Sequence, residues 1–354
     1  MSFPSFTSTE TEPHARGAEL GARLRDAVAA NLAGYTALFE AAGATGEQVR
    51  AWGERALERA AAWAPRLADE IAGLASGAGL EPWQVAVVNA RTEILAALDA
   101  TGPGECSTSV VLPGRGLPPR TVQTWDWLAH LRDAPVLWAY ETRPGHVVRT
   151  FTEAGALAKI GANSAGLGVH FNLLRHRADG GDLGVPVHLI ARRILDEAAT
   201  VEEAADLARS ATVSASTVIT AVTADGAGAI EISPAGVAVV PPDGGVLQHC
   251  NHFLDPALAE GERLGPEEPG TYTRQRYLGD HAGRLGGDDL TARALALVSH
   301  EPEGVPVCAH PDPALPLSEQ WETLATIGLD LPAGRLLVHQ GGPCQVTGST
   351  WQVF

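Results

Sequence analysis

The 354-residue sequence has little positive charge and few cysteines. Lysine and arginine together number 25 against 42 acidic residues, so the formal net charge is −17. Because the basic residues form no run, the composition argues against nucleic acid or any other partner held through its phosphates. The four cysteines are sparse and widely spaced, which indicates a reducing compartment rather than a disulfide framework.

The sequence also lacks two kinds of apolar segment. Its first residues have neither the basic start nor the apolar stretch of a signal peptide, and no run of about 18 apolar residues occurs that would span a membrane. We therefore expect a cytoplasmic protein with no membrane partner. Hydrophobic residues make up 45% of the chain, which is enough for a sizeable core.

The pattern of apolar residues changes near residue 105. Before it, Leu20, Leu24 and Val28 recur every fourth residue, and the spacing stays helical through 46–64, 66–76 and 82–98. After it, short strand-like runs alternate with turns. We predict strands at 107–112, 119–125, 135–142, 146–152, 216–223, 228–232, 235–240, 246–249, 322–330 and 335–340, helices at 186–198, 201–210, 272–284 and 289–299, and a surface loop at 255–270. Strands in two batches separated by helix pairs indicate a layered α+β architecture.

The sequence gives little support for a metal site or a nucleotide site. His249, Cys250 and His252 form one cluster of soft metal ligands, and Cys308 with His310 forms another, but neither spacing is that of a zinc knuckle or a helix-borne site, so we predict no metal. The glycine-rich stretches follow helical patterns, and none ends in Gly-Lys-Ser or Gly-Lys-Thr, so no nucleotide or other cofactor is predicted.

The position of Cys106, between a turn and a predicted strand, is the most informative feature of the sequence. In "GPGECSTSVVLPGRG", residues 102–116, this cysteine stands between a Gly-Pro-Gly turn and a strand-like run. A papain-like nucleophile opens a helix instead, where the helix dipole lowers the pKa of the thiol. If the bond between Glu105 and Cys106 were cleaved, Cys106 would carry both a thiol nucleophile and an α-amine able to act as its base.

Five segments in order resemble one family. "NARTEI" (89–94), "ECSTSVV" (105–111), "TVQTWDW" (121–127), "KIGANSAGLGVHFN" (159–172) and "HCNHF" (249–253) resemble motifs of the acyl-coenzyme A:6-aminopenicillanic acid acyltransferase family of autoproteolytic N-terminal-nucleophile hydrolases. The resemblance covers roughly residues 15–345. It implies a four-layer αββα sandwich, a helical pro-segment at 1–105 and a catalytic part at 106–354 that begins with the nucleophile.

The resemblance also implies site residues. Cys106 matches the nucleophile, and Glu105 the residue before the scissile bond. Asp126 matches the carboxylate that orients the α-amine. Asn251 matches the side-chain donor of the oxyanion hole, Asn163 the backbone region that completes it, and Arg274 an arginine near the nucleophile, for which Arg276 is a rival.

Two residues depart from the family pattern. Relatives often have a small residue where this chain has Glu105, and some have an arginine where Ala309 stands in "VCAHP". If that arginine grips a substrate carboxylate, this chain has lost the contact. We expect an amidohydrolase or acyltransferase that acts, without a cofactor, on a small N-acyl amide or acyl thioester, with acyl-coenzyme A as a donor by family analogy. The alternative is an uncut binding or scaffold protein on the same fold.

Overall fold

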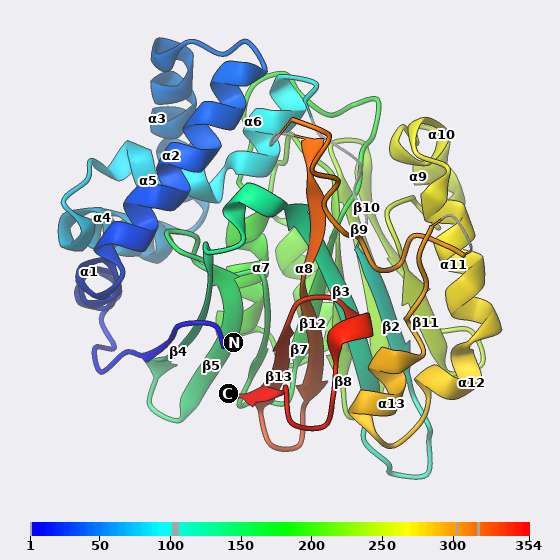
Figure 1. The fold of residues 1–354 in the computed structure, drawn as a ribbon. Coiled ribbons are helices and arrows are strands. Elements are labelled where there is room, and N and C mark those ends of the chain that lie inside the picture. The colour runs from blue at the N-terminus through cyan, green and yellow to red at the C-terminus, as the bar shows by residue number, and fades with distance from the viewer. Residues whose placement is uncertain (1, 101–105, 302–303, 317–318) are drawn as a thin grey trace.

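The computed structural model describes residues 2–100, 106–301, 304–316 and 319–354. Six helices pack together on one side of the molecule, and the strands with the remaining helices form the rest (Figure 1). The six are α1 (Pro13–Arg23), α2 (Arg25–Ala41), α3 (Gly46–Trp63), α4 (Pro65–Ala78), α5 (Pro82–Asn89) and α6 (Arg91–Ala97).

Local sequence signals set the limits of these helices. Thr45 and Gln48 form a capping box at the start of α3, and Gly79 ends α4 in the left-handed conformation with φ of 75°. Helices α1 and α4 pack closely because Gly17 has no side chain there. A Cβ at Gly17 would lie 2.1 Å from the carbonyl oxygen of Glu70.

The larger sheet has eight strands in the order β1-β4-β5-β6-β7-β8-β9-β10. Its neighbours are antiparallel except for the parallel pair β1 and β4. The strands are β1 (Ser5–Thr7), β4 (Pro135–Arg143), β5 (His146–Glu153), β6 (Ile160–Asn163), β7 (Gly168–Leu173), β8 (Thr217–Thr223), β9 (Gly226–Ser233) and β10 (Gly236–Val240). Helices α7 (Val187–Glu197) and α8 (Val201–Arg209) cover its outer face.

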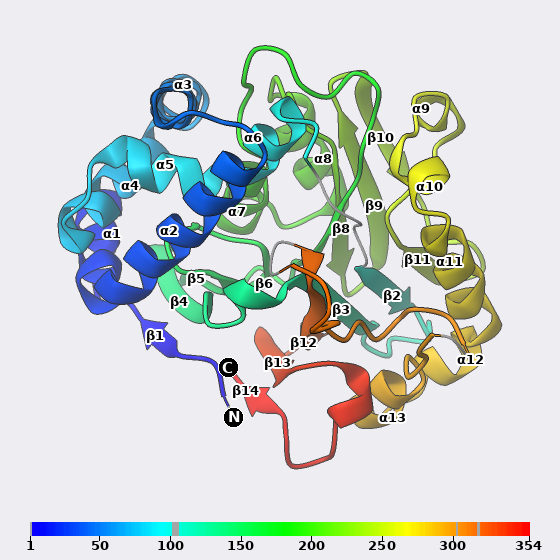
Figure 2. The same cartoon turned by 45° about the horizontal axis from the view of Figure 1, so that its top comes forward.

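The smaller sheet has six strands in the order β11-β2-β3-β12-β13-β14. They are β11 (Val246–His249), β2 (Ser107–Val111), β3 (Arg120–Leu128), β12 (Trp321–Asp330), β13 (Arg335–Gln340) and β14 (Gln352–Val353). Its outer face carries α11 (Gly270–Asp280), α12 (Ala282–Leu285) and α13 (Leu290–Leu295), which lie opposite the N-terminal helices (Figure 2). The inner faces of the two sheets contact each other, so the layers run helix, sheet, sheet, helix.

The structure confirms the predicted αββα sandwich and corrects several details. The predicted loop at 255–270 contains two one-turn helices, α9 (Pro256–Ala259) and α10 (Leu264–Glu267), because Asp255 caps the first through two backbone amides. The helix predicted at 82–98 is interrupted at Ala90, where α5 ends and α6 begins. Strands β1, β6, β7 and β14 were not predicted. Among the described residues, no helix has both the length and the apolar character needed to cross a bilayer.

Candidate active site

Cys106 lies directly before β2, in the interior of the smaller sheet, between β11 and β3. Its side chain is buried, and its carbonyl oxygen accepts hydrogen bonds from Nδ2 of Asn172 over 3.1 Å and Nη1 of Arg274 over 2.9 Å. The next residue, Ser107, pairs with Thr124 of β3, and its backbone N–H donates a hydrogen bond to the Thr124 hydroxyl. The backbone at Cys106 and Ser107 is therefore held by contacts from both sides.

Asp126 of β3 lines the same cavity as Cys106, together with Trp125 and Trp127. Side chains alternate along a strand, so Trp125 and Trp127, whose ring centres lie 6.5 Å apart, share one face of β3 and Asp126 lies between them. The register between β3 and β12 shifts at this point, because Leu324 is the extra residue of a β-bulge in β12 beside Asp126.

The electrostatic surroundings hold the Cys106 thiol in its protonated form. Burial, followed by the negative charge of Asp126, raises the pKa of the thiol to about 11, although Lys159 and Arg274 act in the opposite direction. A thiolate is the reactive form of cysteine. Cys106 in the described chain therefore needs a base or a new positive charge before it can act as a nucleophile.

Arg274 of α11 joins Cys106 to Asn251. Its Nη1 donates to the Cys106 carbonyl oxygen, to the hydroxyl of Ser107 over 3.1 Å and to Oδ1 of Asn251 over 3.2 Å, while Nη2 donates to the same Oδ1 over 3.1 Å. Arg274 is 1% exposed. Its rival Arg276 is an exposed residue two positions further along the helix. The structure therefore places Arg274, and not Arg276, beside Cys106.

Asn251 follows β11 and is completely buried. Its backbone N–H donates to the hydroxyl of Thr271 over 2.8 Å, and its Nδ2 donates to the carbonyl oxygen of Leu173 over 2.9 Å. Because Arg274 fixes Oδ1, the amide has one orientation, with its Nδ2 turned toward Leu173, which itself lines the Cys106 cavity. This arrangement holds the Asn251 amide against Leu173, one of the residues that line that cavity.

The structure does not bring Asn163 to this cavity. Its Nδ2 donates to the carbonyl oxygens of Leu195 and Ala198, and its Oδ1 accepts the backbone amides of Ala165 and Leu167. Asn163 thus fastens the β6–β7 turn to the end of α7. At a rise of about 3.3 Å per residue, it lies roughly 13 Å along the strand from Lys159, the residue of its motif that reaches the cavity. Glu105 lies outside the described residues.

Sequence reasoning missed a buried charged cluster next to Cys106. Lys159 lies 3.5 Å from Oε2 of Glu153, which also pairs with Arg91. The other oxygen of Glu153 accepts the hydroxyl of Tyr35 over 2.5 Å. Lys159 and Arg91 both line the Cys106 cavity. Both belong to segments already identified as motifs, "KIGANSAGLGVHFN" and "NARTEI". Their charged side chains could therefore have been proposed as site residues from the sequence.

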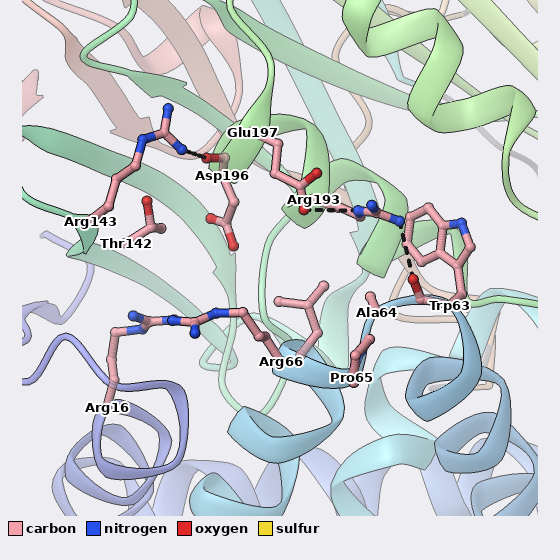
Figure 3. A pocket seen from close by; sticks show the side chains of 11 residues that line it. Arg16, Trp63, Ala64, Pro65, Arg66, Thr142, Arg143, Arg193, Asp196 and Glu197 are labelled. Atoms are coloured by element: carbon pink, nitrogen blue, oxygen red, sulfur yellow. Dashed lines mark hydrogen bonds and ion pairs between the residues drawn. The ribbon is translucent and has the colours of Figure 1, made fainter.

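The cavity beside Cys106 has a volume of about 20 Å³, enough for one water molecule but not for an acyl group. Larger hollows lie elsewhere. One of about 520 Å³ lies between the start of α4, the end of β4 and α7 (Figure 3). Two of its arginines have partners within the lining: Arg193 pairs with Glu197, and Arg143 donates to the backbone of Asp196. It contains no cysteine, serine or histidine.

The predicted clusters of soft ligands are arranged in different ways. His249 hydrogen bonds to Glu231 and His252 to Thr271, so hydrogen bonds account for the first cluster. In the second region, the ligand atoms of His300, His310 and Cys344 lie within 4.8 Å of one another in a partly exposed group that could hold a metal ion. Cys308 instead donates its thiol to the carbonyl oxygen of Leu297.

This chain is similar to known proteins of the family whose motifs it resembles. Residues 120–280 match the model of the family described as acyl-coenzyme A:6-aminopenicillanic acid acyl-transferase. The 40 kDa form of acyl-coenzyme A:6-aminopenicillanic-acid-acyltransferase from Emericella nidulans is 28% identical over 245 residues, which are 69% of this chain and 66% of that protein. The resemblance to this family is confirmed. The chain matches slightly less than two thirds of that relative's length.

Two solved structures are also similar. Penicillin V acylase from Agrobacterium tumefaciens has a TM-score of 0.46 and 16% identity, with coverage of 70% of this chain and 85% of that one. The Caenorhabditis elegans ortholog of N-acylethanolamine-hydrolyzing acid amidase has a TM-score of 0.45 and 15% identity, with coverage of 64% and 93%.

Proposed function

We propose that this chain is a self-processing cysteine amidohydrolase or acyltransferase that works through an acyl-enzyme on Cys106. One observation carries the proposal: Cys106 and Asp126 share a buried cavity, and Arg274 connects the backbone of Cys106 to Asn251. These residues come from distant parts of the sequence and supply a nucleophile, a carboxylate and an oxyanion donor. The named activity of the Emericella nidulans relative, acyl transfer, agrees with this chemistry.

Cleavage between Glu105 and Cys106 would solve the problem of the protonated thiol. It would create an α-amine, whose ordinary pKa is near 8, on the residue that carries the nucleophile. As an amine it accepts the thiol proton, and as an ammonium it stabilises the thiolate. The carboxylate of Asp126 would then orient the new terminus. No metal or organic cofactor is needed for these steps.

In turnover, the Cys106 thiolate would attack the carbonyl carbon of an N-acyl amide or an acyl thioester. Nδ2 of Asn251 and a main-chain N–H would hold the oxyanion, and the acyl group would pass to water or to an amine. Trp125, Trp127 and Phe171 give the cavity apolar walls, and these side chains would have to move apart to admit an apolar acyl group. An acyl-coenzyme A donor rests on the name of the relative alone.

Position 309, where some relatives have an arginine, carries an alanine in this chain. Ala309 is fastened to β12 by hydrogen bonds in both directions with Thr323, the residue that pairs with Asp126. An arginine here would stand near the nucleophile, whereas alanine offers no charge. We therefore propose that the preferred amide has a neutral or cationic amine portion rather than a carboxylate beside the scissile bond.

Intact mass measurement tests the proposal. Wild type is expected to give two fragments, 1–105 and 106–354, whereas Cys106→Ala stays at 36.9 kDa. The cleaved protein is then assayed on N-acyl amines, N-acyl amino acids and a penicillin, with and without an amine acceptor. Identical fragments from both proteins would assign the cleavage to another protease. An uncut, inactive wild type would favour the binding-protein alternative.

A further inference from the structure

Lys159 is the one lysine in the whole sequence, whereas arginine occurs 24 times. Arginine stays charged at every physiological pH, but lysine readily loses its proton when buried. The chain thus uses arginine at all its other basic positions and places its single titratable amine in the interior, where Lys159 is 4% exposed. A simple need for positive charge does not explain that choice.

The surroundings of Lys159 favour a neutral amine. Its Nζ lies 3.9 Å from the ring centre of Trp125 and 5.3 Å from that of Trp127, and within the described part of the chain its acidic contact, at 3.5 Å, is Glu153. Arg91 already neutralises that carboxylate. Burial, opposed by the negative charge of Glu153, lowers the pKa of Lys159 to about 7.

The amine and the thiol lie in one cavity. Lys159 reaches it from the larger sheet and Cys106 from the smaller one, and the charge of each shifts the pKa of the other. Of the residues that the structure describes, the other titratable or charged groups that line this cavity are Arg91 from α6, Asp126 from β3 and His188 from α7. Burial holds the pKa of His188 well below its usual value, so this histidine is neutral and a poor proton acceptor.

We propose that Lys159 accepts the thiol proton of Cys106 in the uncut chain and so acts as the base for self-cleavage. This inference rests on the proposed function. It fills a gap in that function, because the α-amine that serves as the base in turnover exists only after the cut. Before the cut, the nitrogen of Cys106 is an amide and cannot act as a base.

The proposed step balances with water as the one co-reactant. The neutral amine of Lys159 takes the proton from Sγ of Cys106, and the thiolate forms a bond to the carbonyl carbon of Glu105. As the bond from that carbon to the Cys106 nitrogen breaks, the Lys159 ammonium returns the proton to the leaving nitrogen. Water then hydrolyses the thioester, which frees the thiol and leaves a carboxyl group on Glu105.

The single lysine makes a direct titration possible. Protein labelled with ¹³C-lysine in the uncut Cys106→Ala background gives one lysine side-chain signal, whose chemical shift is followed from pH 5 to pH 11. We expect a midpoint near 7, well below the ordinary value of about 10.4. A midpoint at or above 10 would overturn the proposal, because the amine would be protonated throughout the working range.

Self-cleavage kinetics provide the second measurement. Newly synthesised chains are sampled over time by denaturing gel at several pH values for wild type, Lys159→Arg and Lys159→Met. Wild-type cleavage should speed up as pH rises through about 7 and then level off, because the neutral amine is the active form. Both variants should cleave at least about a hundredfold more slowly and lose that midpoint.

Lys159→Arg separates proton transfer from structure, because it keeps the charge beside Glu153 but cannot release a proton. Cleavage of folded Lys159→Arg at the wild-type rate would refute the role of Lys159 and leave the proposed function intact. Failure of wild type itself to cleave, or cleavage of Cys106→Ala, would instead refute the proposed function. Circular dichroism and thermal unfolding identify any variant that has not folded.

Discussion

Nη1 of Arg274 lies 2.9 Å from the carbonyl oxygen of Cys106, although 168 residues separate the two in the sequence. The same guanidinium fixes the amide of Asn251. Arg274→Met removes both contacts, so we expect turnover to fall at least tenfold. Arg276→Met is the matched control, because this exposed arginine lies two residues further along α11. Equal rates for the two variants would remove Arg274 from the site.

Asn251 and Asn163 form a second matched pair, since both are buried asparagines from the predicted motifs. Asn251→Ala should lower kcat by about a hundred- to a thousandfold with little change in KM, the cost of losing one oxyanion donor. Asn163→Ala should lower the melting temperature, because four hydrogen bonds that fasten a turn are lost. A change confined to KM in Asn251→Ala would make that residue a substrate contact.

Asp126→Asn tests the carboxylate. The substitution keeps the shape of the side chain and removes its charge, so we expect kcat to fall about a hundredfold or more in a folded protein. Asp133→Asn, at an exposed position after β3, is the control and should retain wild-type turnover. Unchanged kcat in a well-folded Asp126→Asn would show that this carboxylate has no part in the chemistry.

Glu93 should make stability depend on pH. Burial raises the pKa of this carboxyl to about 7, so the folded chain favours the protonated form. Its contribution is complete below about pH 4.5 and is lost as pH rises through 7. Glu93→Gln imitates that form and can keep the hydrogen bond from the backbone of Val187. In the uncut Cys106→Ala background, urea unfolding should show the glutamine variant more stable at pH 8, by up to about 3 kcal/mol, and similar at pH 5.

A buried ion cluster should dominate the docking of the N-terminal helices. Glu70 of α4 accepts hydrogen bonds from Arg16 of α1 and Arg192 of α7, and all three side chains are buried. Glu70→Gln leaves the buried Arg16 without its carboxylate partner and leaves Arg192 with Asp196 alone, so it should cost about 3–5 kcal/mol in urea unfolding. Glu54→Gln, which breaks an exposed pair with Arg50, should cost less than about 1 kcal/mol.

Motifs with a fixed order predicted the fold and drew attention to the segments that meet around Cys106, because each motif depends on residues close together in the sequence. The strand after Cys106 and the one that carries Asp126 were visible in this way. Strand β6 was missed because "IGAN" is short and made of small residues, and its strand character comes from burial between two neighbouring strands.

Tertiary contacts decided what the motifs left open. The choice between Arg274 and Arg276 depends on which face of α11 packs on the sheet, and the sequence of that helix has no clear apolar stripe. Asn163 shares a motif with Lys159, yet four residues of strand carry it away from Cys106. A motif therefore marks a segment that matters without saying which of its side chains reaches the site.

β1 and the segment around Gln352 hold the first residues of the chain against the sheets. Ser5–Thr7 forms the edge strand of the larger sheet by pairing with β4, and Phe3 exchanges two hydrogen bonds with the side chain of Gln352 near the C-terminus. A cut between residues 105 and 106 would thus divide the sequence without dividing the sheets. The first fragment would stay bound to the second because β1 remains paired with β4. The two fragments should therefore elute together in size-exclusion chromatography until a denaturant separates them.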